Sequence, residues 1–374
     1  MLTLPFDRSD PLMPPAAYTG LPPVAEVSAP DGRRAWLVTS FDAVTQVLTD
    51  ARFEVTPPGA EAAADTLLQD GEAHARLRRL VARAFAPRAI EALRPRIERI
   101  ADERTAAFAE AAEPDLVMFA AAMSAGVIGD LLRVSIGDQG RFHALVGAVS
   151  GDFTDEAAKA WNELTEMAGD LVEQKRHALG DDLLSALIGV HDARDGRLSA
   201  GELVGVVTTI VAAGHQTARN AIAVGTLLLA TEGRLAGLAA APEQDAVVEE
   251  VLRRLAGLIA EPFPRWARER VEVAGVPIEA GDLVIVRLEA ANHDPARFEE
   301  PGRFAPGREG GHVSFGRGPH HCLGAALARI ELTAALRALS TRVPGLRPGV
   351  AVEDLVWRHG LTDAGPVAVP VRFS

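Results

Sequence analysis

The chain has 374 residues, a formal net charge of −13 at pH 7 and 48% hydrophobic residues. This length is ample for a sizeable core, and the acidic balance argues against nucleic acid as the main partner. The N-terminus lacks the basic and apolar regions of a signal peptide, and the apolar run at residues 204–213 is too short to span a bilayer. We therefore expect a soluble, cytoplasmic protein that binds neither nucleic acid nor membrane.

Helical periodicity dominates the first two thirds of the chain. The first predicted elements are a strand at residues 34–39 and a helix at 41–50, with Ser40 as its N-cap. Helices are then expected at residues 74–85, 87–112, 117–132, 137–149, 154–177 and 183–191. The longest predicted helix, at residues 199–231, begins with Ser199 and Glu202 in the arrangement of a capping box.

The last third mixes short strands with two more helices. A helix is expected at residues 242–254, strand signals cluster at 269–288, and an apolar helix follows at 323–339. Residues 367–373 again have strand character. Because no linker and no internal repeat divides the chain, we predict one mainly α domain over residues 1–374, with small β-sheets.

The only cysteine, Cys322, lies in the segment FGRGPHHCLG at residues 315–324. A lone cysteine cannot form an intrachain disulfide, and most such residues are buried small hydrophobes. Here Gly316, Gly318 and Gly324 let the backbone turn tightly and let a bulky group come close.

Positive charge surrounds this cysteine in the sequence. Arg317, His320 and His321 favour the thiolate over the thiol, and the helix predicted at residues 323–339 directs the positive end of its dipole at the sulfur. A loop that stabilises a thiolate and approaches a flat apolar body suits axial ligation of a haem iron. The alternatives are a buried structural cysteine, or a zinc site formed by His312, His320, His321 and Cys322. Zinc is the weaker of these two, because structural zinc takes four ligands, typically with paired spacings, and there is no second cysteine.

The segment resembles the haem-binding loop of the cytochromes P-450, whose pattern is Phe-Gly-x-Gly-x-His-x-Cys-x-Gly. The fixed positions are filled by Phe315, Gly316, Gly318, His320, Cys322 and Gly324. The resemblance covers nearly the whole chain and is closest to the soluble bacterial type. It implies a cytochrome P-450 fold, which is a single large α-rich domain with a long central helix over haem b, and it implies Cys322 as the thiolate ligand of the iron.

A second constellation, AGHQT, lies midway along the longest predicted helix. A glycine inside a helix costs about 1 kcal/mol relative to alanine, and Thr217 can bond a carbonyl one turn back and bend the helix. Ala213, Gly214 and Thr217 match the family's oxygen-binding segment, whereas Gln216 stands where the family usually has an acid. An amide can hydrogen-bond but cannot ionise, so this departure puts ordinary proton delivery in doubt. The bland alternative is an ordinary buried helix with one tolerated glycine.

Charged residues elsewhere also match the family. The resemblance implies a buried ion pair between Glu250 and Arg253, with Arg303 as the third member of this scaffold. It further implies that the haem propionates are held by four basic side chains, and arginine suits such bidentate contacts. These are His74, Arg78, Arg265 and His320.

Partners and substrate are inferred more indirectly. Residues 71–100 hold eight arginines against three glutamates. In the resembled fold this basic patch faces an acidic ferredoxin, which receives its electrons from a ferredoxin reductase. Fold analogy places substrate contacts at residues 55–70, at Ala213, at 257–262 and at Leu361 and Thr362. Short connections at residues 57–70 and 152–155 predict an open mouth, which fits a bulky or carrier-tethered small molecule.

The predicted function is that of a haem-thiolate monooxygenase acting on a small molecule of secondary metabolism. Gln216 keeps open a rival chemistry, either oxidative C–C or C–O coupling or a peroxide-dependent reaction. A non-catalytic haem-binding protein and a helical scaffold without cofactor are the rivals from other classes.

Overall fold

The computed structural model describes residues 2–60, 65–82, 85–133, 139–149, 155–193, 197–359 and 364–373. Within these ranges no helix is both long enough and apolar enough to cross a membrane. Leu361, Thr362 and most of the connection at residues 152–155 lie outside the described residues, as does part of the segment at 57–70.

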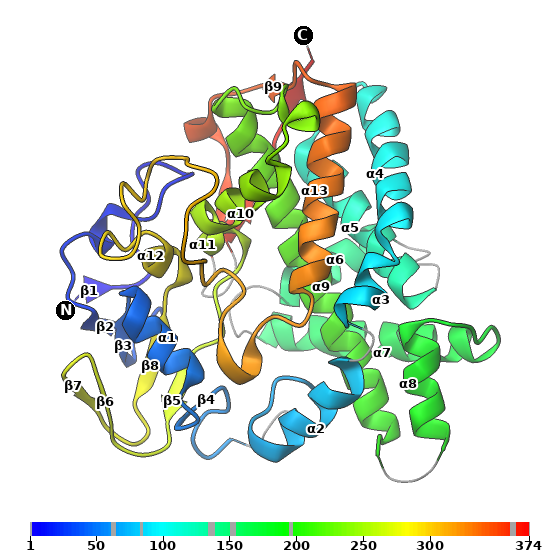
Figure 1. Ribbon diagram of the computed structural model, residues 1–374. Helices are drawn as coiled ribbons and strands as arrows, with labels where there is room; N and C mark the ends of the chain where they lie inside the picture. Colours follow the sequence, from blue (N-terminus) through cyan, green and yellow to red (C-terminus); the bar gives the residue numbers. More distant parts are fainter. Residues whose placement is uncertain are drawn as a thin grey trace.

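The helices form the larger part of the molecule (Figure 1). They are α1 (Phe41–Thr49), α2 (Gly71–Ala82), α3 (Pro87–Glu91), α4 (Arg94–Ala109), α5 (Leu116–Leu132), α6 (Gln139–Val149), α7 (Asp155–Arg176), α8 (Leu183–Asp192), α9 (Ala200–Thr231), α10 (Gln244–Arg254), α11 (Ala256–Ile259), α12 (Leu288–Asn292) and α13 (Ala325–Arg342). These bounds confirm most of the helices predicted from periodicity.

One predicted helix is wrong in its extent. Residues 87–112 were expected to be continuous, but α3 ends at Glu91 and α4 begins at Arg94. Pro95 occupies the first turn of α4, where its missing N–H is tolerated. Further inside a helix the proline ring would clash with the preceding turn, so the chain breaks ahead of it.

The strands form one mixed sheet and three small ribbons. The six-stranded sheet has the order β1 (Leu2–Thr3), β2 (Val24–Ser28), β3 (Arg34–Val38), β8 (Leu283–Val286), β5 (Arg265–Ala267) and β4 (Phe53–Glu54). The antiparallel ribbons pair β6 (Val271–Val273) with β7 (Val276–Ile278), β10 (Trp357–His359) with β11 (Ala364–Pro366), and β9 (Arg347–Pro348) with β12 (Val371–Arg372).

Helix α9 is the centre of the helical part, and α5, α7 and α13 pack against it. Its N-terminus carries the predicted capping box, because Ser199 accepts from the Glu202 amide at 3.1 Å and Glu202 accepts from the Ser199 amide at 2.8 Å. Most of its side chains are buried, as expected of a helix that is covered on several sides. At Gly205 a Cβ atom would lie 1.9 Å from the Asp65 carbonyl oxygen, so only glycine lets that backbone cross the helix here.

Candidate functional site

The segment around Cys322 forms a tight loop ahead of α13. Gly316 and Gly318 have φ angles of 67° and 72°, which other residues rarely adopt. A Cβ atom on Gly318 would also lie 2.3 Å from the Leu48 carbonyl oxygen at the end of α1. The Cys322 amide donates to the Phe315 carbonyl at 2.9 Å and closes the loop. Gly316 and Gly318 are therefore needed for the shape of the loop, as the sequence predicted, whereas Gly324 has a φ angle of −85° that other residues also adopt.

The Cys322 side chain is exposed, yet protein atoms crowd the region around it. This crowding raises the pKa of the thiol, and the Gly324 amide, Arg78 and Arg329 act to lower it. The sequence had assigned the favourable charges to Arg317, His320 and His321.

The structure corrects that assignment. The Arg317 guanidinium lies 5.5 Å from the centre of the Phe41 ring, and His320 contacts Asp70. The cations that favour the thiolate come from α2 and α13, which are distant in sequence from the loop or follow it. Sequence proximity to Cys322 was therefore a poor guide to which charges act on its sulfur.

His74 and Arg78 on α2 contact the Cys322 loop, and His320 belongs to the loop itself. His74 on α2 lies between the Leu67 carbonyl at 3.1 Å and the Pro319 carbonyl at 3.2 Å. Its ring centre lies 4.2 Å from that of His320, and Arg78 donates to the His321 carbonyl. The predicted pair on α2 and the predicted histidine of the loop are thus brought together.

Arg265, at the start of β5, is only 4% exposed. Its guanidinium donates to the Phe263 carbonyl at 2.5 Å and contacts no carboxylate within the described ranges. Burial lowers its pKa to about 10. A buried cation without a carboxylate partner is costly, so this site fits an anionic group such as a haem propionate.

The sequence did not identify Asp70, which joins two parts of this site. Its carboxylate accepts from the Val55 and Thr56 amides, and His320 Nε2 lies 3.2 Å from it. Burial acts to raise its pKa, but the hydrogen bonds from His320, Val55 and Thr56 outweigh burial and hold the pKa at about 2. Asp70 therefore stays ionised and ties the loop at residues 55–56 to the Cys322 loop.

The predicted segment on α9 is helical without interruption. Thr217 Oγ1 donates to the Ala213 carbonyl at 2.7 Å, which confirms the expected bond one turn back. Ala213 is exposed and Gly214 is half-buried, whereas Gln216 is 2% exposed and lies inside the protein. Ser124 on α5, which the sequence did not single out, donates to the His215 carbonyl at 3.2 Å and holds the two helices together here.

The ion-pair scaffold is present, with one predicted member wrong. Arg253 contacts Glu250 through two hydrogen bonds of 2.8 Å, and both side chains are 2% exposed. Arg303 does not join them; it is 68% exposed and pairs with Glu300 at 3.1 Å. The third cation is Arg308, whose Nε lies 3.3 Å from Glu250. Arg303 follows the turn at Pro301 and Gly302, whereas Arg308 follows a second Pro-Gly turn at residues 306–307. Only the path of the loop decides which of the two arginines turns inward.

Asn292, at the end of α12, connects the scaffold to the Cys322 loop. Arg253 donates to its backbone carbonyl at 2.6 Å. Its side chain donates to Ser314 Oγ at 2.8 Å and accepts from the Val313 amide at 2.9 Å. The buried pair on α10 therefore fixes the start of the loop that carries Cys322.

Comparisons with known proteins agree with this arrangement. A family model described as Cytochrome P450 matches residues 238–340. The 6-deoxyerythronolide B hydroxylase of Saccharopolyspora erythraea is 38% identical, over 92% of this chain and 91% of that protein. The mycinamicin IV hydroxylase/epoxidase of Micromonospora griseorubida is also 38% identical, over 93% of this chain and 92% of that protein.

Solved structures match over the full length as well. The mycinamicin VIII C21 methyl hydroxylase of Micromonospora griseorubida, bound to mycinamicin VIII, superposes with a TM-score of 0.90 at 31% identity and covers 100% of both chains. A putative thioether synthase of griseoviridin tailoring gives a TM-score of 0.91 at 32% identity, over 100% of this chain and 99% of that chain.

Proposed function

This chain belongs to the cytochrome P450 family, and on that premise we propose that Cys322 is the axial thiolate ligand of a haem b. The single observation that supports this best is the exposed thiol of Cys322 in a loop that His74 and Arg78 contact. In this proposal His74, Arg78, Arg265 and His320 would hold the propionates, and Phe315, Gly316 and Gly324 would shape the loop that carries Cys322.

The protein is an oxidoreductase of the monooxygenase type, with a haem-iron cofactor, a small-molecule substrate and a redox partner. A bound haem would supply oxygen-activating chemistry, in which one atom of dioxygen enters the substrate and the other becomes water with two electrons from the redox partner and two protons. The chain supplies binding, orientation and protons.

Proton delivery on the distal face is proposed for Thr217. Its Oγ1 donates to the Ala213 carbonyl, which leaves the oxygen lone pairs free to accept from water. Ala213 and Gly214 have small side chains or none and leave room on this face of α9. Gln216 is buried and cannot ionise, so its proposed role is to hold the local hydrogen bonds rather than to release a proton.

The first test is the reduced carbon-monoxide difference spectrum of the parent and of Cys322→Ala. We expect a strongly red-shifted Soret band in the parent that the variant lacks. A band unaffected by the substitution would overturn the ligand assignment. Comparing turnover with NADPH and ferredoxin proteins against turnover with hydrogen peroxide separates the monooxygenase from a peroxide-driven reaction.

The proposed substrate class is a secondary metabolite, because the similar proteins are named as hydroxylases of such molecules. A perturbation of the Soret spectrum on adding 6-deoxyerythronolide B or mycinamicin IV would support this class. A carrier-tethered substrate is the narrower form of the proposal, and binding of the carrier-linked form but not of the free acid would support it.

We further propose a ferredoxin as electron donor, which reaches the basic patch on α2 and α3 in the cytoplasm. Arg76 forms an ion pair with Glu202, whereas Arg79 and Arg88 are exposed. The proposed docking patch therefore centres on Arg79 and Arg88. Exposed cations steer an acidic partner through its long-range field, and salt screens that field.

Charge reversal tests this docking. In Arg79→Glu the apparent Michaelis constant for ferredoxin should rise and its salt dependence should flatten. Arg270→Glu, on the exposed β6–β7 ribbon, is the matched control and should change neither. Equal behaviour of the two variants would contradict the proposed docking face.

A further inference from the structure

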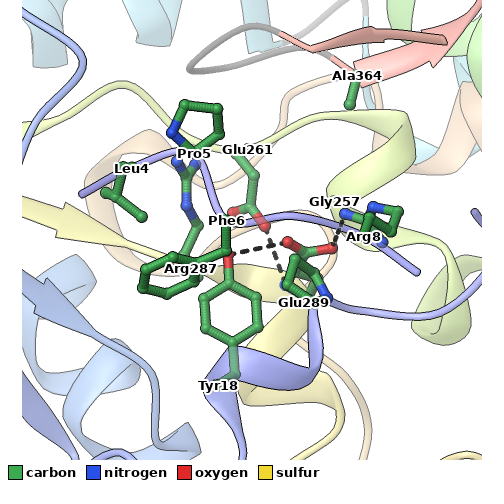
Figure 2. Close-up of a pocket in the computed structure, with 11 residues that line it drawn as sticks. Leu4, Pro5, Phe6, Arg8, Tyr18, Gly257, Glu261, Arg287, Glu289 and Ala364 are labelled. Atoms are coloured by element: carbon green, nitrogen blue, oxygen red, sulfur yellow. Dashed lines mark hydrogen bonds and ion pairs between the residues drawn. The ribbon is translucent and has the colours of Figure 1, made fainter. Parts of the chain in front are cut away.

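A small cavity of about 40 Å³ lies beneath the N-terminal segment and is lined by none of the residues of the Cys322 loop. Figure 2 shows that Arg8, Tyr18, Glu261, Arg287 and Glu289 gather around it. A space of this volume holds about one water molecule and is too small for an organic ligand. The charged side chains around the cavity therefore bind one another and not an organic ligand.

The residues at 4–18, here called the N-terminal strap, attach to the body through this cluster. Arg8 donates to Glu289 Oε2 at 2.6 Å, and both side chains are less than a tenth exposed. The same guanidinium donates to the Met13 carbonyl and so closes the strap on itself. Tyr18 donates to the other oxygen of Glu289 at 3.0 Å. Both oxygens of Glu289 are thus taken by the strap.

Glu261 is the second carboxylate of the cluster. It accepts from the Leu288 amide at 2.7 Å and from the Glu289 amide at 3.0 Å, at the start of α12. The buried guanidinium of Arg287 faces both carboxylates and Tyr18. Two arginines and two glutamates therefore balance in charge, and removal of either arginine leaves a buried carboxylate without its partner.

The cluster also contacts α11. A Cβ atom on Gly257 would lie 2.3 Å from Glu289 Oε2, so α11 and Glu289 are in direct contact. The Asn220 side chain donates to the Ile259 carbonyl at the end of α11 at 3.4 Å and to the Ala364 carbonyl at 3.3 Å. Asn220 lies three residues after Thr217 on α9, so α11 is held beside the distal face.

The segment at residues 256–265 runs from α11 past Glu261 to Arg265. One end is thus held next to the proposed oxygen-binding segment of α9, and the other end carries the buried cation proposed to hold a propionate. Glu261 anchors its middle to α12. Any shift of this segment changes the space beside the haem.

We propose that the N-terminal strap, through Arg8 and Tyr18, positions the segment at residues 256–265 and thereby sets how tightly bulky ligands pack beside the haem. The inference rests on the proposed haem site and adds to it a positioning role for residues far away in the sequence. Arg8, Tyr18, Glu261 and Glu289 act here through the segment and do not touch the ligand.

Two azoles test the proposal in the holoprotein. Imidazole needs only the iron, whereas 4-phenylimidazole also needs a well-formed wall for its phenyl ring. In Arg8→Met the ratio of the dissociation constant for 4-phenylimidazole to that for imidazole should rise about threefold to tenfold, as expected for a coupled site that is not in contact. Tyr18→Phe should raise this ratio by a smaller factor. In Arg8→Lys, which keeps the positive charge, the ratio should lie between those of the parent and of Arg8→Met.

The matched control is Arg33→Met, which breaks an exposed pair with Asp31 close to the strap in sequence. Its azole ratio should equal that of the parent. An unchanged ratio in Arg8→Met, or in Tyr18→Phe if Arg8→Met does not retain haem, would overturn the proposal even if the melting temperature falls. A parent without the thiolate carbon-monoxide band would overturn the haem site itself, and this inference with it.

Discussion

The molecule contains two buried charge networks, the ion-pair scaffold and the strap cluster, and they differ in how far apart their members lie in the sequence. In the scaffold, Glu250 and Arg253 are three residues apart on α10 and share two hydrogen bonds. In the strap cluster, Arg8 and Glu289 are 281 residues apart and meet through one. The carboxylates of both networks are buried, yet only the first network is visible in a helical spacing.

The difference lies in what each network fixes. Burial acts to raise the pKa of Glu250, but Arg253, the Ala305 amide and Arg308 outweigh burial and hold the pKa below its ordinary value. Burial raises the pKa of Glu261 to about 7, because fewer direct partners offset it. The scaffold is thus fully compensated and supports the Cys322 loop, whereas the strap cluster is balanced only as long as the strap is docked.

The largest effect is expected at the scaffold. Arg253→Met should lower the free energy of unfolding by about 3–5 kcal/mol, because Glu250 is left buried without its main partner. Thermal unfolding and haem content of the purified protein measure this. Arg303→Met is the control and should stay within about 0.5 kcal/mol of the parent, since its pair is exposed. Equal losses would contradict the corrected scaffold.

The third cation gives an intermediate effect. Arg308→Met removes one contact to Glu250 and hydrogen bonds to the Glu299, Glu300 and Arg303 carbonyls. We expect a loss of about 1.5–3 kcal/mol, the usual range for hydrogen bonds to charged groups. Chemical denaturation should therefore rank the three arginines as 253, then 308, then 303. A larger loss for Arg303→Met than for Arg308→Met would restore the prediction made from the sequence.

A double-mutant cycle measures the strap. Arg8→Met, Glu289→Gln and the double variant should show a coupling free energy of about 1–2 kcal/mol in thermal unfolding, because the two side chains share a buried ion pair. The same cycle between Arg33 and Glu289, which share no contact in the described part of the chain, should be additive. A coupling near zero for Arg8 and Glu289 would mean that their ion pair does not stabilise the docked strap.

Glu331 sharpens the contrast, because no cation in the described part of the chain compensates this buried carboxyl. Glu331 on α13 is 4% exposed, and its Oε1 has no hydrogen-bond partner among the described residues. Burial raises its pKa to about 8. Between the ordinary carboxyl value of about 4.3 and that value, the unfolded chain releases a proton that the folded protein keeps, so the stability of the parent falls as pH rises.

Glu331→Gln should therefore gain stability relative to the parent as pH rises from 5 to 8. The gain should be at most about 1.4 kcal/mol per pH unit, from the linkage slope of one proton. Melting temperatures of both proteins at several pH values in this window test it. Parallel curves for parent and variant would show that Glu331 is ionised or hydrated in the folded protein.

Local patterns were predicted well from the sequence. The capping box at Ser199, the N-cap at Ser40 and the Thr217–Ala213 bond all join residues within four positions, so spacing alone suggests them. The break before Pro95 was missed, although the proline itself was the signal. No local sequence pattern indicated the roles of Asp70, Ser124 and Asn292, because the side chain of each contacts residues at least 14 positions away.

The sequence by itself determined the helices, the shape of the Cys322 loop and the pair on α10, because these depend on backbone preferences and on residues within one turn of each other. Only the tertiary structure decided that Arg308 rather than Arg303 reaches Glu250, that Arg78 and Arg329 act on the thiol, and that Arg8 closes on Glu289. Charges attract any opposite charge within reach, so their partners are chosen by the packing of the apolar core around them.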